Sequence, residues 1–250
     1  MLLSDGVWAQ VGENSALEIR ACLSCPLPSL PMRFLVFLLV VLCSGQGWAD
    51  ECEQLPKPSV TVTRLVDERL VVNTQHGYKA LNHLGAAYAR PGIQVLGLTR
   101  GNAVVQFATS IPSYVDRTGR WECASPQLAL TLGFSEMTVY VANEFPESSC
   151  AYKEIYQHEL RHVNAYQTHL AGIEKDVTDT LNRRFSTGGL WRGPTGQARA
   201  RLQRELNERW LPYIKREMAR AEEAQALIDT HDEYARVTEA CNGEIKKRTR

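Results

Sequence analysis

The pentapeptide His158-Glu159-Leu160-Arg161-His162 lies in a stretch whose apolar spacing predicts a long helix. Four residues advance an α-helix by slightly more than one turn, so the two imidazoles project from one face. Zinc binds imidazole nitrogens at about 2.0–2.1 Å, and a catalytic zinc site leaves one position open for water. We therefore expect His158 and His162 to bind one Zn²⁺, with Glu159 beside it as the general base of a hydrolase.

The apolar residues of the same stretch indicate which face of this helix is buried. At about 100° per residue, the face that carries both histidines of the pentapeptide also carries His169. The apolar residues of this face are Ala151, Ile155, Ile173, Val177 and Leu181. A histidine on a buried face needs a polar partner. For His169, which lies outside the pentapeptide, we expect an ordinary hydrogen bond to a carbonyl.

Residues 32–49 have the pattern of a secretory signal. Met32-Arg33 supplies a charged start, residues 34–42 form a short apolar core, and residues 43–49 form a small-residue end. We expect cleavage after Ala49, with residues 1–31 as a wrongly assigned upstream extension. The apolar run is shorter than the roughly 20 residues of a membrane span. The mature chain therefore has no predicted span, and we expect it to be periplasmic or secreted.

The charge balance gives no sign of a nucleic-acid partner. The whole chain has 28 basic and 28 acidic residues. Removal of the first 49 residues takes away two basic and three acidic side chains, which leaves 26 and 25 and a net charge of +1. A nucleic-acid-binding domain is normally far more basic. The partner that we expect is a peptide or protein substrate, such as one in the cell envelope.

The cysteines indicate disulfides. Four of the seven remain after residue 49, namely Cys52, Cys123, Cys150 and Cys241. Four cysteines in an exported chain suggest two disulfides, with three connectivities open. We expect Cys123 to pair with Cys150, and Cys52 to pair with Cys241 so that the ends of the domain are joined. Zinc ligation by cysteine is the alternative, although these four include no C-x-x-C pair.

Residues 50–147 are predicted to form the strand-rich half of a single domain over 50–243. Alternating apolar and polar residues predict three strand pairs, which are 59–66 with 70–73, 95–98 with 103–108, and 127–132 with 137–143. The turns of the last two pairs are expected at Arg100-Gly101-Asn102 and at residues 133–136. A short helix is expected over 77–89, ended by Pro91-Gly92.

Residues 148–243 are predicted to be the helical half, with Ser148 or Ser149 as N-cap. A glycine-rich loop over 186–196 separates the first helix from a second amphipathic segment, which has a kink or restart at Pro212. The basic tail over 244–250 is expected to fray. The fold class is therefore α+β: a small, mostly antiparallel sheet on the pentapeptide helix, followed by a long C-terminal helical hairpin partner.

Strands followed by a metal-binding helix occur in zincin metallopeptidases, which this chain resembles through His158, Glu159 and His162. It is more loosely similar to the bacterial family of predicted secreted zinc-dependent proteases. Members of that family combine an export signal, a strand half, the same helix and a C-terminal helix that closes with His-Gly, where this chain has Asn242-Gly243. The resemblance covers residues 59–243. It implies a zincin-like domain in which strand 137–143 is the edge strand that aligns a peptide substrate.

A catalytic zinc needs a third protein ligand. The metzincin pattern H-E-x-x-H-x-x-G-x-x-H is not met, and His169 lies too far along an unbroken helix to share the ion. We therefore expect a ligand from the second helical segment. In an antiparallel helix pair residues near 160 would face residues near 220, which favours Glu217 on the apolar stripe. The alternatives, as ligands or as partners of a zinc histidine, are His231 and Asp232.

Three functions fit this pattern. The leading hypothesis is an exported zinc peptidase with Glu159 as base, in which Tyr166 or Tyr234 is a candidate donor to a developing oxyanion. The second is a zinc-dependent amidase or other hydrolase of the cell envelope. The third is a non-catalytic envelope binding protein with a structural metal site. A closed shell of four protein ligands, or a Glu159 that points away from the metal, would favour this third function.

Overall fold

Two long antiparallel strands, β4 (Gly97–Ser110) and β7 (Gln127–Val141), form the centre of the main sheet. The computed structural model describes residues 12–13, 51–66, 70–86 and 93–249. The expected signal over 32–49 lies outside the described residues, and so does the expected extension over 1–31 apart from residues 12–13. Pro91-Gly92, the expected end of the short helix, lies outside them as well.

The main sheet is mixed rather than mostly antiparallel. Its order is β1-β4-β7-β2, and β3 also pairs with β7. β2 (Ser59–Val66) runs parallel to the first half of β7, and β3 (Val71–Asn73) runs parallel to its second half. The short β1 (Gly12–Glu13) is parallel to β4. Because β2 and β3 both pair with β7 along its length, the expected hairpin between 59–66 and 70–73 is wrong.

The two turns expected at Arg100-Gly101-Asn102 and at 133–136 are irregularities within continuous strands. The pairing register of β4 and β7 shifts between Arg100 and Asn102, and a Cβ at Gly101 would lie 2.9 Å from Met137 Sδ. A Cβ at Gly133 would lie 2.5 Å from the carbonyl oxygen of Leu65. These glycines admit a β-bulge and a close neighbouring strand, which an alternation pattern does not distinguish from a turn.

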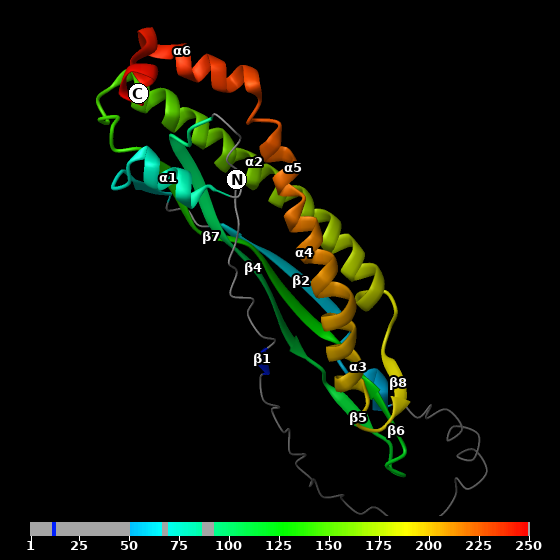
Figure 1. Cartoon of the computed structure of the whole chain (residues 1–250). Helices are drawn as coiled ribbons and strands as arrows, with labels where there is room; N and C mark the ends of the chain where they lie inside the picture. The colour runs from blue at the N-terminus through cyan, green and yellow to red at the C-terminus, as the bar shows by residue number, and fades with distance from the viewer. Residues whose placement is uncertain (1–11, 14–50, 67–69, 87–92, 250) are drawn as a thin grey trace, which may run out of the picture.

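A second, three-stranded sheet lies at the far end of the molecule (Figure 1). β5 (Ser113–Val115) pairs with β6 (Trp121–Ala124), and β6 pairs with β8 (Trp191–Pro194), in both cases antiparallel. The expected loop over 186–196 therefore contains a strand. This strand adds to the small sheet before the chain enters its second helical segment.

The long helix α2 (Cys150–Leu181) carries the pentapeptide and packs on β2, β4 and β7. Ser149 is its N-cap, as predicted, and its hydroxyl accepts a hydrogen bond from the Tyr152 N–H at 3.1 Å. The buried face follows the expected apolar stripe, with Ile155, Val177 and Leu181 at most 2% exposed. A π-helical turn, η2 (Asn182–Ser186), follows α2. The short helix predicted over 77–89 is α1 (Tyr78–Leu84).

The second helical segment runs back along α2 in the opposite direction (Figure 1). Its elements are α3 (Ala198–Glu205), the π-helical turn η3 (Leu206–Trp210), α4 (Leu211–Ala219) and α5 (Ala221–Ala226). The sequence predicts a kink or restart at Pro212, and the helical segment instead runs on without a break there, changing from the π-helical turn η3 to α4 one residue earlier. After a turn, α6 (His231–Arg248) continues toward the start of α2. The predicted α+β class is confirmed, and no helix among the described residues combines the length and apolar character that a bilayer span requires.

The end of α6 packs against the domain. Residues 240–243 are not helical, and Cys241 and Asn242 have φ values of 59° and 55°. Beyond this kink Ile245 is only 1% exposed, and the Glu244 carboxylate accepts a hydrogen bond from the Ala151 N–H at 3.3 Å. Residues 244–249, which we expected to fray, are therefore held against the start of α2.

Both disulfides differ from the expected pairing. Cys52 pairs with Cys123, and Cys150 pairs with Cys241, with Cα–Cα distances of 5.9 and 5.7 Å. The expected Cys123–Cys150 bond is wrong because β7 lies between these residues. Its 15 residues span roughly 50 Å at about 3.3 Å each, and a disulfide needs Cα atoms within about 7 Å. The observed bonds hold opposite ends of the molecule, in the small sheet and at the start of α2 (Figure 1).

Candidate metal centre

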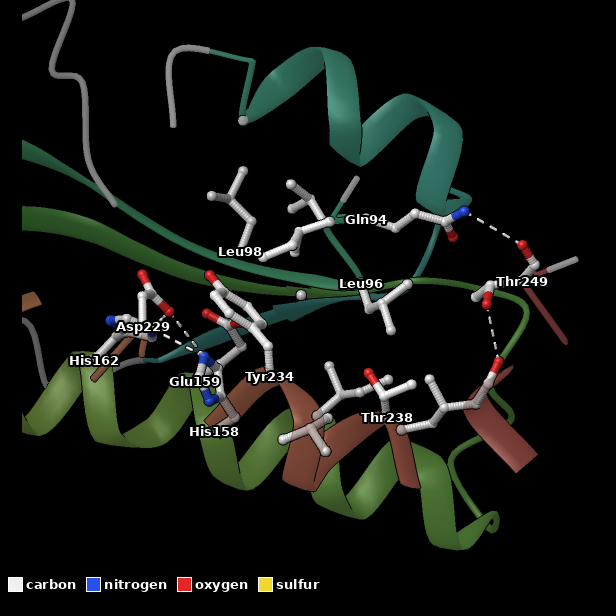
Figure 2. A pocket seen from close by; sticks show the side chains of 17 residues that line it. Gln94, Leu96, Leu98, His158, Glu159, His162, Asp229, Tyr234, Thr238 and Thr249 are labelled. Atoms are coloured by element: carbon white, nitrogen blue, oxygen red, sulfur yellow. Dashed lines mark hydrogen bonds and ion pairs between the residues drawn. The ribbon is translucent and has the colours of Figure 1, made fainter. Parts of the chain in front are cut away.

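Three side chains converge on one point at the buried face of α2. His158 and His162 are 7% and 2% exposed, and their Nε2 atoms lie 3.2 Å apart. The third group is Asp229, from the turn between α5 and α6. Its Oδ1 lies 3.2 Å from His158 Nε2 and 3.2 Å from His162 Nε2. Figure 2 shows the two rings and this carboxylate facing one another. Two imidazoles and one carboxylate can hold a metal ion here.

The triangle of donor atoms matches the spacing that a tetrahedral ion imposes. Ligands about 2.0 Å from an ion at tetrahedral angles lie about 3.3 Å from one another, close to the 3.2 Å of all three edges. The residues therefore fit a metal ion without a change of rotamer.

Polar partners of the two Nδ1 atoms orient both rings so that their Nε2 atoms face this point. His162 Nδ1 donates to the side-chain oxygen of Gln225, which is 0% exposed. His158 Nδ1 lies 3.2 Å from Glu233 Oε1 and 2.9 Å from Arg161 Nη2. A neutral histidine that donates through Nδ1 has its lone pair on Nε2. Two ring nitrogens and a carboxylate thus face one another, and they repel unless a cation or a proton lies between them.

The ionisation of the cluster reflects this convergence. Burial opposes the charged form of Asp229, but hydrogen bonds from His158 and His162 outweigh it and hold the pKa of this carboxyl far below its ordinary 3.8. Burial also opposes a charge on His158, yet the hydrogen bond to Asp229 and the nearby charge of Glu159 raise its pKa above 6.5. The site therefore attracts positive charge, as a proton or as a metal ion.

An ion-pair network fixes Glu233 behind His158. Arg236 Nε and Nη2 donate to the Glu233 carboxylate at 3.0 and 2.9 Å, and Arg161 donates to the same group. Arg236 also donates to Glu154 Oε2 on α2 at 2.9 Å. These arginines, Arg236 foremost, keep the pKa of Glu233 far below its ordinary value. The carboxylate stays ionised and holds the His158 ring in place, as is usual behind a metal-binding histidine.

Glu159 is buried beside the triad without belonging to it. It is 4% exposed, and its Oε2 accepts a hydrogen bond from the Thr99 hydroxyl of β4 at 2.8 Å. A Cβ at Gly97 would lie 2.5 Å from Glu159 Oε1, so the absence of a side chain on Gly97 makes room for this carboxylate. β4 therefore positions Glu159, while α2 supplies it.

A cavity of about 290 Å³ opens over the triad and Glu159. It lies between the start of β4, α2 and α6, and Tyr234 of α6 lines it with its ring 6.1 Å from that of His158. In Figure 2 the Tyr234 ring projects over Glu159 from α6. Tyr166, the other expected donor, does not line this cavity. It is 1% exposed and packs on Phe134 in the core.

The expected third ligand, Glu217, is wrong. Its carboxylate pairs with Arg220 at 2.6 Å, and its carbonyl oxygen lies 2.9 Å from His169 Nε2. The latter contact confirms the hydrogen bond to a carbonyl that we expected for His169. The alternatives, His231 and Asp232, are exposed in the first turn of α6 and do not join the triad.

The register of the helix pair explains this error. His162 lies opposite Gln225, and His169 lies opposite Glu217, so residues near 160 face residues well beyond 220. A signal for Asp229 was nevertheless present. Thr230 and Glu233 have the spacing of a capping box, and the Thr230 hydroxyl accepts from the Glu233 N–H at 3.2 Å. This pattern starts a helix at His231 and leaves Asp229 in the preceding turn.

The strand along the cavity also differs from the expectation. Residues 137–143 were expected to form a substrate-aligning edge strand, but β7 pairs with β4 on one side and with β3 on the other over this stretch. Residues 94–98, at and just before the start of β4, line the cavity instead.

No family model, no curated protein and no solved structure matches this chain significantly.

Proposed function

We propose that this protein is a zinc-dependent peptidase in which Glu159 is the general base. The observation that carries the proposal is the convergence of His158, His162 and Asp229 next to a buried carboxylate from the same helix. Two imidazoles and one carboxylate are a ligand set of catalytic zinc, which keeps its fourth position open. Among the described residues no fourth histidine, cysteine or acidic group joins this cluster, which favours a catalytic site over a closed structural one.

Each residue has a role in this proposal. Zinc held by the triad would polarise the substrate carbonyl and lower the pKa of a coordinated water to about 7. Glu159 takes a proton from the attacking water and returns it to the leaving amine. The hydroxyl of Thr99 engages Glu159 Oε2, so Oε1 is the oxygen that exchanges the proton. Tyr234 is a hydrogen-bond donor for the charge that develops on the carbonyl oxygen.

The start of β4 supports an extended peptide as substrate. β7 occupies one side of β4 from Gly97 onward. On the other side, the only strand among the described residues that pairs with β4 is β1, at Ala108 and Thr109. Backbone groups near Gly97 and Leu98 are thus placed to hydrogen-bond a peptide strand beside the triad. Strand addition holds the backbone of any sequence, and the cavity walls then select the side chain.

The two disulfides support an exported location. Such bonds persist in the bacterial periplasm or outside the cell and are rare in reducing compartments. Together with the signal pattern over 32–49, they lead us to propose that the mature protein is periplasmic or secreted.

Metal analysis of the purified mature protein tests the ligand set. We expect close to one zinc per chain, lost in His158→Ala, His162→Ala and Asp229→Ala. Glu217→Ala is the matched control, because its carboxylate pairs with Arg220 instead, and it should keep the metal. Retention of zinc in Asp229→Ala together with loss in Glu217→Ala would refute this ligand set.

Hydrolysis of unfolded protein or peptide mixtures by the zinc-loaded protein tests the reaction. Glu159→Gln should keep zinc and lose hydrolysis by at least about 100-fold, while Glu223→Gln, an exposed glutamate on α5, should behave as wild type. Zinc-loaded wild type without any hydrolysis, or a fully active Glu159→Gln, would exclude the proposed mechanism.

A further inference from the structure

The cavity over the triad has two chemically different ends. At the metal end lie the ionisable groups of His158, Glu159, His162 and Asp229. Away from them the wall is aliphatic and comes from three elements (Figure 2). Its apolar residues are Ile93, Val95 and Leu96 from the segment before β4, Leu98 from the start of β4, Ile155 from α2, and Val237 and Ile245 from α6.

The distal end has no charged lining residue among those that the structure describes. Its polar groups are Gln94, Thr238 and Thr249, and Gln94 Nε2 donates to the Thr249 carbonyl oxygen at 3.3 Å. That hydrogen bond links the residues before β4 to the end of α6 across the far end of the cavity, as Figure 2 shows. The distal end is thus neutral and mostly apolar, and the Gln94–Thr249 hydrogen bond closes it.

We propose that the distal end of this cavity is a specificity pocket for one large apolar side chain, such as leucine or phenylalanine, next to the bond that is cleaved. This inference rests on the proposed peptidase function, because the triad fixes where the substrate carbonyl lies. A carbonyl at the metal end directs a neighbouring side chain toward the aliphatic walls. The whole cavity, with its metal end, has a volume of about 290 Å³, just below the roughly 300–1,000 Å³ typical of ligand pockets. It suits one or two residues of an extended chain.

Charged side chains are disfavoured by the same walls. A lysine or aspartate side chain in the distal end would lose water without gaining a partner of opposite charge, which is strongly unfavourable. A small side chain such as alanine would leave the aliphatic wall without contacts. An apolar pocket typically discriminates by about tenfold or more for each missing methylene group. The affinity for leucine should therefore exceed the affinities for alanine, lysine and aspartate by at least about tenfold.

Thr238 allows a matched pair of variants. It is half-buried on the cavity side of α6, one turn after Tyr234, whereas Ala235 is exposed on the same helix and does not line the cavity. Thr238→Asp places a carboxylate in the pocket wall. Ala235→Asp adds the same charge to the same helix outside the pocket. Zinc content and melting temperature of both variants report whether they fold.

The experiment uses amino-acid hydroxamates, which attach to zinc and need no turnover. Binding of leucine, alanine, lysine and aspartate hydroxamates to the zinc-loaded protein is measured by calorimetry, alongside cleavage of peptides that vary at one position. We expect wild type to prefer leucine by at least about tenfold in both assays. Thr238→Asp should weaken leucine hydroxamate and strengthen lysine hydroxamate by a similar factor, and Ala235→Asp should change neither.

The outcomes separate this inference from the function on which it rests. Peptide cleavage with affinities for the four hydroxamates within threefold of one another would overturn the pocket alone. A leucine preference in binding with no peptide cleaved would overturn the peptidase proposal and keep the apolar pocket. The wild-type series decides the question even if Thr238→Asp does not fold.

Discussion

Gln225 accepts a hydrogen bond from His162 Nδ1 across the interface of α5 and α2, and both side chains are almost fully buried. The same amide donates to the His162 carbonyl oxygen at 3.4 Å. Gln225 therefore sets both the tautomer and the orientation of one proposed ligand, although it touches no metal itself.

Replacement of Gln225 should weaken zinc binding. We expect Gln225→Ala to lower the zinc affinity 10- to 100-fold, the range typical for partners of ligating histidines, measured by competition with a chromophoric chelator. Gln225→Glu keeps the acceptor oxygen and should retain most of the affinity. Gln157→Ala, on the exposed face of α2 beside His158, is the control. Equal affinities of Gln225→Ala and Gln157→Ala would show that this hydrogen bond does not orient the ligand.

The stabilisation that zinc gives should grow with pH. The raised pKa of His158 means that the metal-free fold favours the protonated ring. This contribution is fully present below the ordinary pKa of 6.5 and is lost as pH rises through the higher folded value. Zinc requires the unprotonated Nε2. The difference in melting temperature between zinc-loaded and metal-free protein should therefore widen between about pH 6 and pH 8.

Glu233→Gln provides the internal test of this pH dependence. The Glu233 carboxylate helps to raise the pKa of His158, so its neutralisation should move the transition to lower pH. The lowered pKa values of Asp229 and Glu233 themselves affect stability only at more acidic pH, because those carboxylates are ionised throughout the range. A melting-temperature difference that is constant from about pH 6 to pH 8 would contradict the assignment of His158 as the titrating ligand.

Gly97→Ala should separate metal binding from catalysis. The added methyl group would lie 2.5 Å from Glu159 Oε1 and 2.8 Å from the Ile155 Cγ2 atom, so the carboxylate must move. A displacement of about 1 Å can reduce a rate about 100-fold, and we expect that loss in kcat with zinc content unchanged. Gly193→Ala in β8, where no atom lies within 4 Å of the new Cβ, should be neutral. Full activity of Gly97→Ala would mean that Glu159 tolerates displacement and is not the base.

The sequence predicted those features of the site that depend on local geometry. The shared face of His158 and His162 follows from their spacing, and the start of α2 follows from the Ser149 cap. Asp229 depends instead on how two helices align over a long return path. β8 draws the connection into the small sheet, and the π-helical turns η2 and η3 alter the phase of both helices. No local pattern fixes such a register, so the sequence predicts Glu217, with His231 and Asp232 as alternatives, and misses Asp229.

The sheet and the disulfides were mispredicted for a related reason. The sequence predicts turns at Gly101 and Gly133, although each lies within a long strand, where a Cβ would meet the Met137 side chain or the Leu65 backbone. Once β7 is a single strand, Cys123 and Cys150 are separated by its whole length, and the expected disulfide becomes impossible. The misplaced turn at Gly133 thus affected both the pairing expected within 127–143 and the expected Cys123–Cys150 bond.

The two disulfides should contribute differently to the metal centre. Cys150–Cys241 joins the start of α2 to α6. α6 supplies Glu233 and Tyr234 and begins two residues after Asp229. Cys52–Cys123 holds the small sheet at the other end of the molecule. Removal of a native disulfide typically costs about 2–5 kcal/mol, so we expect both double serine variants to melt at lower temperature.

Cys150→Ser with Cys241→Ser should in addition lower the zinc affinity, because α6 can then move away from α2. Cys52→Ser with Cys123→Ser should leave the affinity unchanged. Chelator competition at a temperature where both variants remain folded measures this difference, and equal zinc affinities would mean that the ion pairs of Glu233 hold α6 in place without the covalent bond.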